Sequence, residues 1–243
     1  MIITRADQAR DLGLLLAIKV SIAPPAEVYA LLAPILAERT PFRLLDLIGE
    51  GLSNCPGTKM DIFLDEIASH ATIGGWTVIA SALRSSLSQE MQKVINLTYG
   101  FIIRADTWYA CDCFGERVLG QALVDEFDTA LKVFSAWRID KNRWVRRSVG
   151  VAGHLWAKRS SGAMDLAPQT VELLKFYEPL LAEQQIDAAK GVGWALKTLG
   201  RYYPEALFNF LHEYGGRTIS PIILRKALKF LPENLRTMYK REA

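Results

Sequence analysis

Residues 144–157 read WVRRSVGVAGHLWA, and the apolar residues in this stretch recur at intervals of three and four. Such spacing places them on one face of an α-helix, whereas a half-buried strand would alternate apolar and polar residues. The same period returns in short segments along the whole chain, among them VYALLAPILAE, MDIFLDEIASHA, TVELLKFYEPLLA and ILRKALKFL. Breaker stretches such as IAPPAE, ERTPF and RSSGAMDLAP separate them. No stretch shows convincing strand alternation, so the sequence predicts an all-α fold of about a dozen short helices.

The succession of short helices, without one long bundle pattern, favours an α-solenoid of HEAT-like antiparallel helix pairs. Stacked pairs of this kind create a concave surface. The chain has 243 residues, of which 50% are hydrophobic, and this is enough to bury a core without disulfides or metal. We therefore expect a single HEAT-like repeat domain over residues 1–243 and a monomeric protein.

Charge is unevenly distributed along the chain. Residues 138–243 hold 18 Lys and Arg against 10 Asp and Glu, a net charge of +8, while residues 1–137 carry a net charge of −5. A basic half on a chain of net charge +3 points to an anionic partner, with nucleic acid first, although a merely solvated basic face gives the same count. In a solenoid, the basic half would line a concave basic groove.

Several other classes of protein find little support. No apolar run reaches the length of a membrane span, and the opening MIITRADQARD lacks the basic and apolar regions of a signal peptide, so we expect a cytoplasmic protein. The three cysteines, Cys55, Cys111 and Cys113, suit neither a disulfide framework nor the usual zinc spacing, and are expected to be reduced thiols that pack as small hydrophobes. No GxSxG motif or histidine pair with metal-ligand spacing occurs.

The first stretch that could carry chemistry is DTWYACD at 106–112. Trp108 and Asp112 stand four residues apart, so a helix would present the ring and the carboxylate on one face. Buried in the core, that carboxylate would be a liability; facing a ligand, it could be functional.

Two further stretches lie in the basic half. In DKNRWVRRSVG (140–150), helical spacing puts Arg143 on the same face as Arg146 and Arg147, around Trp144. In KGVGWALK (190–197), Lys190, Trp194 and Lys197 share a face. Its two glycines, Gly191 and Gly193, each cost a helix about 1 kcal/mol relative to alanine, which suggests that another backbone approaches closely there.

Each stretch also has an ordinary structural interpretation. Tryptophans in helices are usually core anchors, and clustered arginines are usually solvated or paired with acids on a neighbouring helix. The functional interpretation rests on the coincidence of rings, a carboxylate and cations on helix faces that a solenoid would turn toward one groove.

Together, DTWYACD, NRWVRRS, KGVGWALK and the ending ISPIILRKALKFL resemble the AlkD-type DNA alkylation repair glycosylases, which are built of HEAT-like repeats. The resemblance covers about residues 100–243, while the first half is similar only as generic helical repeat. Lys197 stands where the family often has arginine, and a lysine keeps the charge but loses the bidentate fork.

The resemblance implies an enzyme that hydrolyses the N-glycosidic bond of N3- or N7-alkylated purines in double-stranded DNA and leaves an abasic site. Asp112 would be the catalytic carboxylate, with Trp108 and Trp194 beside the lesion. Arg147 would hold a phosphate near the lesion, and further backbone contacts would come from Arg143, Arg146, Lys190 and Lys197. No metal or organic cofactor is implied, and a DNA repair role would associate this cytoplasmic protein with the nucleoid.

Two alternatives remain open on the sequence. One is a DNA-binding HEAT-like relative that has lost catalysis, although the presence of Asp112 argues against it. The other is a HEAT-type scaffold for protein interactions, which would show little salt-sensitive affinity for duplex DNA.

Overall fold

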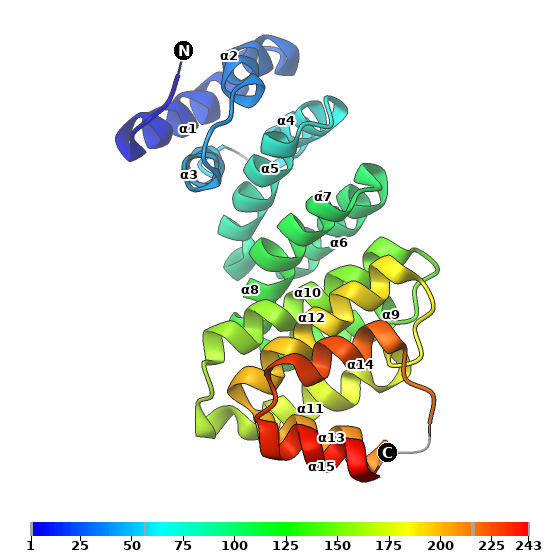
Figure 1. The fold of residues 1–243 in the computed structure, drawn as a ribbon. Coiled ribbons are helices and arrows are strands. Elements are labelled where there is room, and N and C mark those ends of the chain that lie inside the picture. The colour runs from blue at the N-terminus through cyan, green and yellow to red at the C-terminus, as the bar shows by residue number, and fades with distance from the viewer. Residues whose placement is uncertain (1, 56, 215–216, 243) are drawn as a thin grey trace. The chain divides into compact units, whose positions relative to one another are not determined.

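The computed structural model describes residues 2–55, 57–214 and 217–242, and these ranges contain helices and turns without a strand (Figure 1). The predicted all-α fold is confirmed. No helix within these ranges is long and apolar enough to cross a membrane. The α-helices are α1 (Ala6–Val20), α2 (Pro25–Ala37), α3 (Phe42–Leu52), α4 (Gly57–Ser69), α5 (Ile73–Ser85), α6 (Leu87–Ala105), α7 (Trp108–Phe114), α8 (Gln121–Asp125), α9 (Phe127–Trp137), α10 (Arg143–Ser160), α11 (Ala167–Tyr177), α12 (Ile186–Tyr202), α13 (Pro204–Glu213), α14 (Pro221–Ala227) and α15 (Glu233–Glu242). A π-helical turn, η1 (Gly115–Gly120), and the short 3-10 turns η2 (Met164–Leu166), η3 (Glu178–Leu180) and η4 (Leu228–Phe230) complete the elements.

The chain divides into two compact units, Met1–Val118 and Leu119–Ala243. In the first unit, α1, α3, α5 and α7 pack one against the next in chain order. Helices α2 and α4 contact each other and form part of a second layer, and α6 packs on α5 and α7. The core between the layers is aromatic and aliphatic, with Trp76, Phe63 and Phe114 fully buried.

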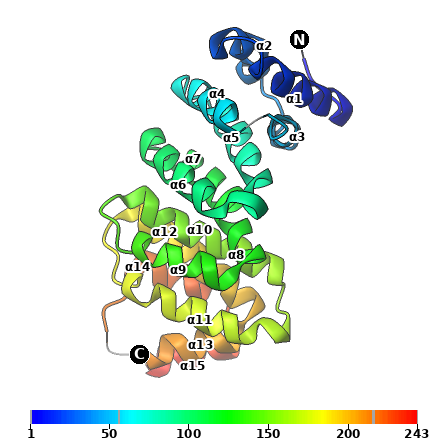
Figure 2. The same cartoon turned by 180° about the vertical axis from the view of Figure 1, so that it is seen from behind.

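The second unit repeats the same principle. Helices α10, α12 and α14 lie side by side in one layer, and α9, α11, α13 and α15 follow one another in the other (Figures 1 and 2). Tyr177 is buried between the layers, and its hydroxyl donates a hydrogen bond of 2.8 Å to the carbonyl oxygen of Val149. This contact joins α11 to α10, so the layer of α9, α11, α13 and α15 supports the helix that carries the arginine run.

All three cysteines are buried reduced thiols, as the sequence predicts. Cys113 packs beside Thr77, and burial raises the pKa of its thiol to about 11. A thiol with so high a pKa is a poor nucleophile at neutral pH, which agrees with a packing role for Cys113.

Candidate active site and nucleic-acid interface

Helix α7 carries the predicted carboxylate and indole. Trp108 and Asp112 belong to one uninterrupted α-helix, four residues apart, so their side chains share a face. Trp108 is 58% exposed and Asp112 is half-buried, while Ala110 and Phe114 on the opposite side are fully buried. Trp108 is therefore not a core anchor, and the shared face carries a large ring that the core does not use.

Both ends of α7 are held by contacts within the first unit. Before it, Asp106 adopts a left-handed conformation with φ of 42°, which ends α6 and turns the chain into the new helix. At its C-terminal end, the Phe114 ring stacks on Phe101 with centroids 5.9 Å apart and meets Trp76 edge-on at 6.1 Å. These contacts fix the direction in which Trp108 and Asp112 point.

The π-helical turn η1 follows α7 without a break, and an ion pair secures it. Arg117 donates from Nε to Oδ1 of Asp46 at 2.6 Å and from its terminal nitrogen to Oδ2 at 3.3 Å. Ser81 donates to the same Oδ1 at 2.7 Å. π-helical turns are rare and are frequently found at functional sites. The anchored turn next to Asp112 therefore agrees with a functional role for this face of α7. No sequence signal pointed to it.

Helix α10 uses its arginines in three different ways. Asn142 caps the helix by accepting a hydrogen bond of 2.8 Å from the backbone N–H of Trp144, whose ring is buried at 5% exposure. Arg143 lies exposed over this ring, 4.8 Å from its centroid, and its Nε is 3.5 Å from a carboxylate oxygen of Asp187. Trp144 is thus the core anchor that the structural interpretation expects, and Arg143 remains on the surface above it.

Arg146 forms an ion pair with Glu183, which precedes α12. Its Nε and a terminal nitrogen donate to the two carboxylate oxygens of Glu183, at 2.5 and 3.2 Å, and its other terminal nitrogen donates to the carbonyl of Asp140 at 2.6 Å. The Arg146 and Glu183 side chains are only 13% and 8% exposed. With this bidentate pair in place, Arg146 supports the fold of the second unit, and a phosphate would have to compete with Glu183 for its guanidinium.

Arg147 is 7% exposed and donates to the backbone carbonyl of Asp187 at 3.0 Å. Its helix approaches α12 very closely: a Cβ on Gly191 would lie 2.5 Å from the carbonyl oxygen of Arg147, and a Cβ on Gly150 would lie 2.3 Å from the backbone of Gly191. The close backbone approach that the glycines of KGVGWALK predict is confirmed at Gly191.

Gly193 makes room for a residue that the sequence analysis did not select. A Cβ at this position would lie 2.6 Å from Cδ of Lys226 on α14, so the lysine stem lies over the glycine. Burial and the neighbouring cations Lys197 and Arg147 lower the pKa of Lys226. Arg225 and Lys190 contribute in the same direction. The signal was present in the ending PIILRKALKFL, but only the packing of α14 on α12 shows which of its lysines belongs with the others.

These four side chains, Arg147, Lys190, Lys197 and Lys226, form what we call the basic cluster of the second unit. Lys197 lies 5.4 Å from the centroid of the Phe230 ring, and burial together with Lys229 and Arg201 lowers its pKa. The neighbouring cations that lower the pKa of Lys197 and Lys226 also raise the local positive potential, which favours an anion.

Trp194 is half-buried and stacks on His154, with ring centroids 4.1 Å apart and planes inclined by 22°. The Thr198 hydroxyl donates to the carbonyl of Trp194 at 3.0 Å, so it accepts from Nδ1–H of His154 at 2.7 Å. Burial, with Lys158 and Lys197 nearby, lowers the pKa of His154 to about 4. A neutral imidazole therefore supports one face of the Trp194 indole at neutral pH.

The pKa of His154 predicts a pH-dependent stability. Because the folded pKa of about 4 lies below the ordinary value of 6.5, the unfolded chain binds a proton between these values that the folded chain does not. This group's contribution is complete above pH 6.5 and is lost as the pH falls toward 4. Allowing for partial exposure, we expect a loss of roughly 1–2 kcal/mol in the free energy of unfolding. In urea titrations at pH 7 and 4.5, the free energy of unfolding should fall less between the two pH values for His154→Asn than for wild type. An equal fall in both proteins would contradict the assignment.

The predicted residues thus lie in two places. Trp108 and Asp112 share a helix face in the first unit, while Trp194 and the basic cluster lie on α10, α12 and α14 of the second. Tyr109 packs edge-on against Trp108 at 5.9 Å, and Trp156 is 3% exposed and packs among Phe127 and Tyr203 in the core.

An all-helical protein of this kind, with a carboxylate beside an exposed indole on one helix and cations gathered over three others, has features suited to a polyanionic ligand that carries a cationic group. A comparison with models of protein families matches residues 76–231 to "DNA alkylation repair enzyme". Since the match covers more than half of the chain, this protein belongs to the DNA alkylation repair enzyme family. Searches of curated proteins and of solved structures gave no match.

Proposed function

We propose that the protein is a monofunctional DNA glycosylase that removes N3- and N7-alkylated purines from double-stranded DNA. The observation that carries the proposal is the α7 face, where Asp112 stands one turn from an exposed Trp108 inside the region that matches the family. Membership in a DNA alkylation repair family supports DNA as the substrate, and the specificity and mechanism are our inference from the residues. We also propose that the helices stack as a HEAT-like solenoid whose basic groove receives the duplex.

The reaction does not require a strong general acid. An alkylated purine already carries a positive charge, so the bond between its glycosidic nitrogen and C1′ breaks with the electron pair moving to the base, which leaves neutral. The deoxyribose becomes oxocarbenium-like, and water adds to C1′ and loses a proton to give an abasic site. An ionised Asp112 would stabilise the developing charge on the sugar and orient the water.

The indoles and cations would position the substrate. Indole faces attract cations by about 0.5–2 kcal/mol, so Trp108 and Trp194 are proposed to contact the damaged nucleotide and to favour its cationic state. A neutral His154 behind Trp194 adds no repulsion to such a contact. Arg147, Lys190 and Lys197 would bind phosphates, joined by Lys226, while the exposed Arg143 would bind them in competition with Asp187.

The direct test measures release of methylated purine from alkylated duplex DNA by the full-length protein, with binding of undamaged duplex at 50 and 200 mM salt. We expect release without strand cleavage and an affinity that falls at least tenfold between the two salt concentrations. Salt-sensitive binding without release would favour a non-catalytic DNA-binding relative. Absence of both would favour a protein-interaction scaffold.

A further inference from the structure

Helix α1 of the first unit is apolar on two faces. Its inward face contains Leu12, Leu16 and Val20, which are at most 6% exposed. Four large aliphatic residues lie on the outward face, exposed by 47%, 41%, 62% and 74% in the order Leu14, Leu15, Ile18 and Ile22. We call these four residues the α1 stripe. A helix that is apolar all round is normally buried, so the stripe is expected to be covered in the working protein.

The α1 stripe lies at the end of a row of helices. Helix α1 comes first in the row α1, α3, α5 and α7, so only one of its sides meets a neighbour in that row (Figure 1). Terminal repeats of helical stacks need a polar outer face for solubility. Here the exposed residues between positions 14 and 22 are the stripe itself and Lys19. The turn after α1 continues the row, because the N–H of Ile22 donates to the carbonyl of Lys19 at 3.0 Å.

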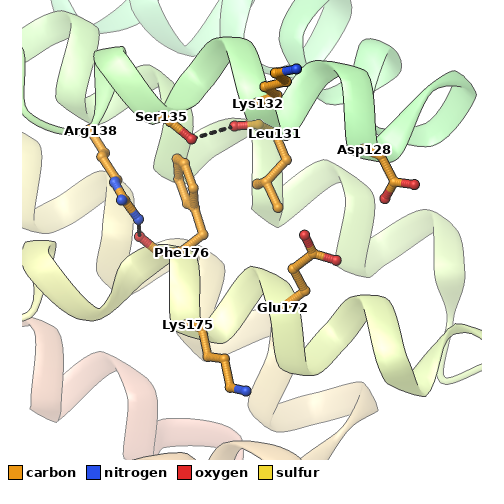
Figure 3. Close-up of a pocket in the computed structure, with 8 residues that line it drawn as sticks. All are labelled: Asp128, Leu131, Lys132, Ser135, Arg138, Glu172, Lys175 and Phe176. Carbon is orange, nitrogen blue, oxygen red and sulfur yellow. Dashed lines mark hydrogen bonds between the residues drawn. The ribbon is translucent and has the colours of Figure 1, made fainter.

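The surface between α9 and α11 shows the more usual arrangement (Figure 3). Its hollow, of about 430 Å³, contains Leu131 and Phe176, which are only 6% and 4% exposed. Charged side chains line the same hollow: Asp128, Lys132, Arg138, Glu172 and Lys175. Single exposed apolar residues are ordinary on protein surfaces, whereas a contiguous apolar patch marks an interaction surface. The α1 stripe is of the second kind.

The charges beside the α1 stripe favour a second copy of the chain as its cover. Two neighbouring rows follow the outward face at intervals of four residues, Leu14–Ile18–Ile22 and Asp11–Leu15–Lys19. If two copies of α1 pack antiparallel about a two-fold axis near Leu15, Asp11 of each copy lies beside Lys19 of the other, because both are four residues from the axis. A parallel arrangement would instead bring like charges together. The face is therefore complementary to itself in charge as well as in apolar character.

A membrane surface fits the same face less well. Helices that lie on membranes carry several Lys or Arg residues on the polar face and are attracted by anionic lipids. In α1 the cations Arg10 and Lys19 are balanced by Asp7 and Asp11, and residues 1–137 carry a net charge of −5. An anionic membrane would repel this half of the chain.

We propose that the α1 stripe is a homodimer interface, in which α1 packs antiparallel on α1 of a second copy. Helix α1 has 15 residues and is about 22 Å long. Stable interfaces bury about 800 Å² per partner, and one helix of this length offers less, so the dimer should be weak and form at micromolar concentrations. This proposal replaces the monomer expected from the sequence, and it does not depend on the proposed enzyme activity.

The first test measures self-association and the role of the α1 stripe. Sedimentation equilibrium of the full-length protein from about 1 to 200 µM covers the Kd of about 1–100 µM expected for a small apolar interface. Ile18→Glu places a charge in the middle of the stripe and should raise the Kd at least about tenfold, because the dimer would bury that charge. Val171→Glu places the same charge on a 44% exposed apolar residue of α11, and should stay within about twofold of wild type. Circular dichroism verifies that both variants are folded.

The second test addresses the antiparallel orientation. Asp11→Lys and Lys19→Asp each place two pairs of like charges across the two-fold axis, so each single variant should raise the Kd about three- to tenfold. The double variant exchanges the two charges and forms the pairs again with reversed sign. It should therefore return to within about twofold of the wild-type Kd.

Several results would overturn the proposal. A wild-type protein that remains monomeric at the highest concentration would do so, as would equal weakening by Ile18→Glu and Val171→Glu. Failure of the double charge exchange to restore association would exclude the antiparallel pairing. Co-sedimentation of a monomer with vesicles of phosphatidylcholine and phosphatidylserine would make the stripe a membrane contact instead. None of these measurements uses DNA or base release, so failure of the glycosylase proposal leaves them interpretable.

Discussion

Asp112→Asn is expected to lower the release of N3- or N7-methylpurine by at least about 100-fold, because removing one preorganised electrostatic group from a transition state typically costs 10²–10³ in rate. The amide keeps the shape of the side chain but removes the negative charge that would stabilise the oxocarbenium-like sugar. Single-turnover release from methylated duplex is the measurement, with duplex binding determined alongside. Affinity should change little, because the phosphate contacts belong to other residues.

Asp106→Asn provides the matched control. It removes one negative charge at the start of the same helix, and asparagine tolerates the left-handed conformation that Asp106 adopts. We expect this variant to retain release within about threefold of wild type, since Asp106 has no proposed contact with the sugar. Equal losses of base release in both variants would mean that Asp112 contributes only to the general negative potential and has no specific catalytic role. Full activity of Asp112→Asn would remove it from the mechanism.

Gly150→Ala is expected to destabilise the second unit strongly. The added Cβ would lie 2.3 Å from the carbonyl carbon of Gly191 and 2.4 Å from the backbone nitrogen of Val192. Helix backbone cannot rotate away as a side chain can, so α10 and α12 must separate. Overpacking of this kind costs about 1–3 kcal/mol and sometimes more, which corresponds to a lowering of Tm by several degrees in a chain of this size.

Gly100→Ala should have the opposite sign. Gly100 lies on α6, and a Cβ there would meet nothing within 4 Å. Replacing a helical glycine with alanine then contributes about 0.5–1 kcal/mol of stability, through the reduced freedom of the unfolded chain. Thermal and urea denaturation of the two variants and wild type measures both effects. A Gly150→Ala protein as stable as wild type would show that α10 and α12 do not approach as closely as described.

Sequence reasoning located the helix faces better than the partners of the residues on them. Within one helix, side-chain positions follow from chain spacing, so the common face of Trp108 and Asp112 could be predicted from four residues of separation. The contact between Arg146 and Glu183 could not, because it joins residues 37 positions apart in the sequence and depends on how α10 meets the turn before α12. For the same reason the sequence showed that Lys226 belongs to a basic ending but could not place it beside Lys197.

What the sequence determined by itself is what repeats locally: the helical period, the charge asymmetry, the paired indole and carboxylate on α7, and the close approach that Gly191 permits. Only the tertiary structure decided which cations are already paired and which gather into a cluster. It also revealed that a neutral His154 supports Trp194 and that α14 brings Lys226 beside Lys197. The physical reason is that periodicity and propensity act over one or two turns of helix, whereas burial, ion pairing and pKa depend on segments that meet only when the layers pack.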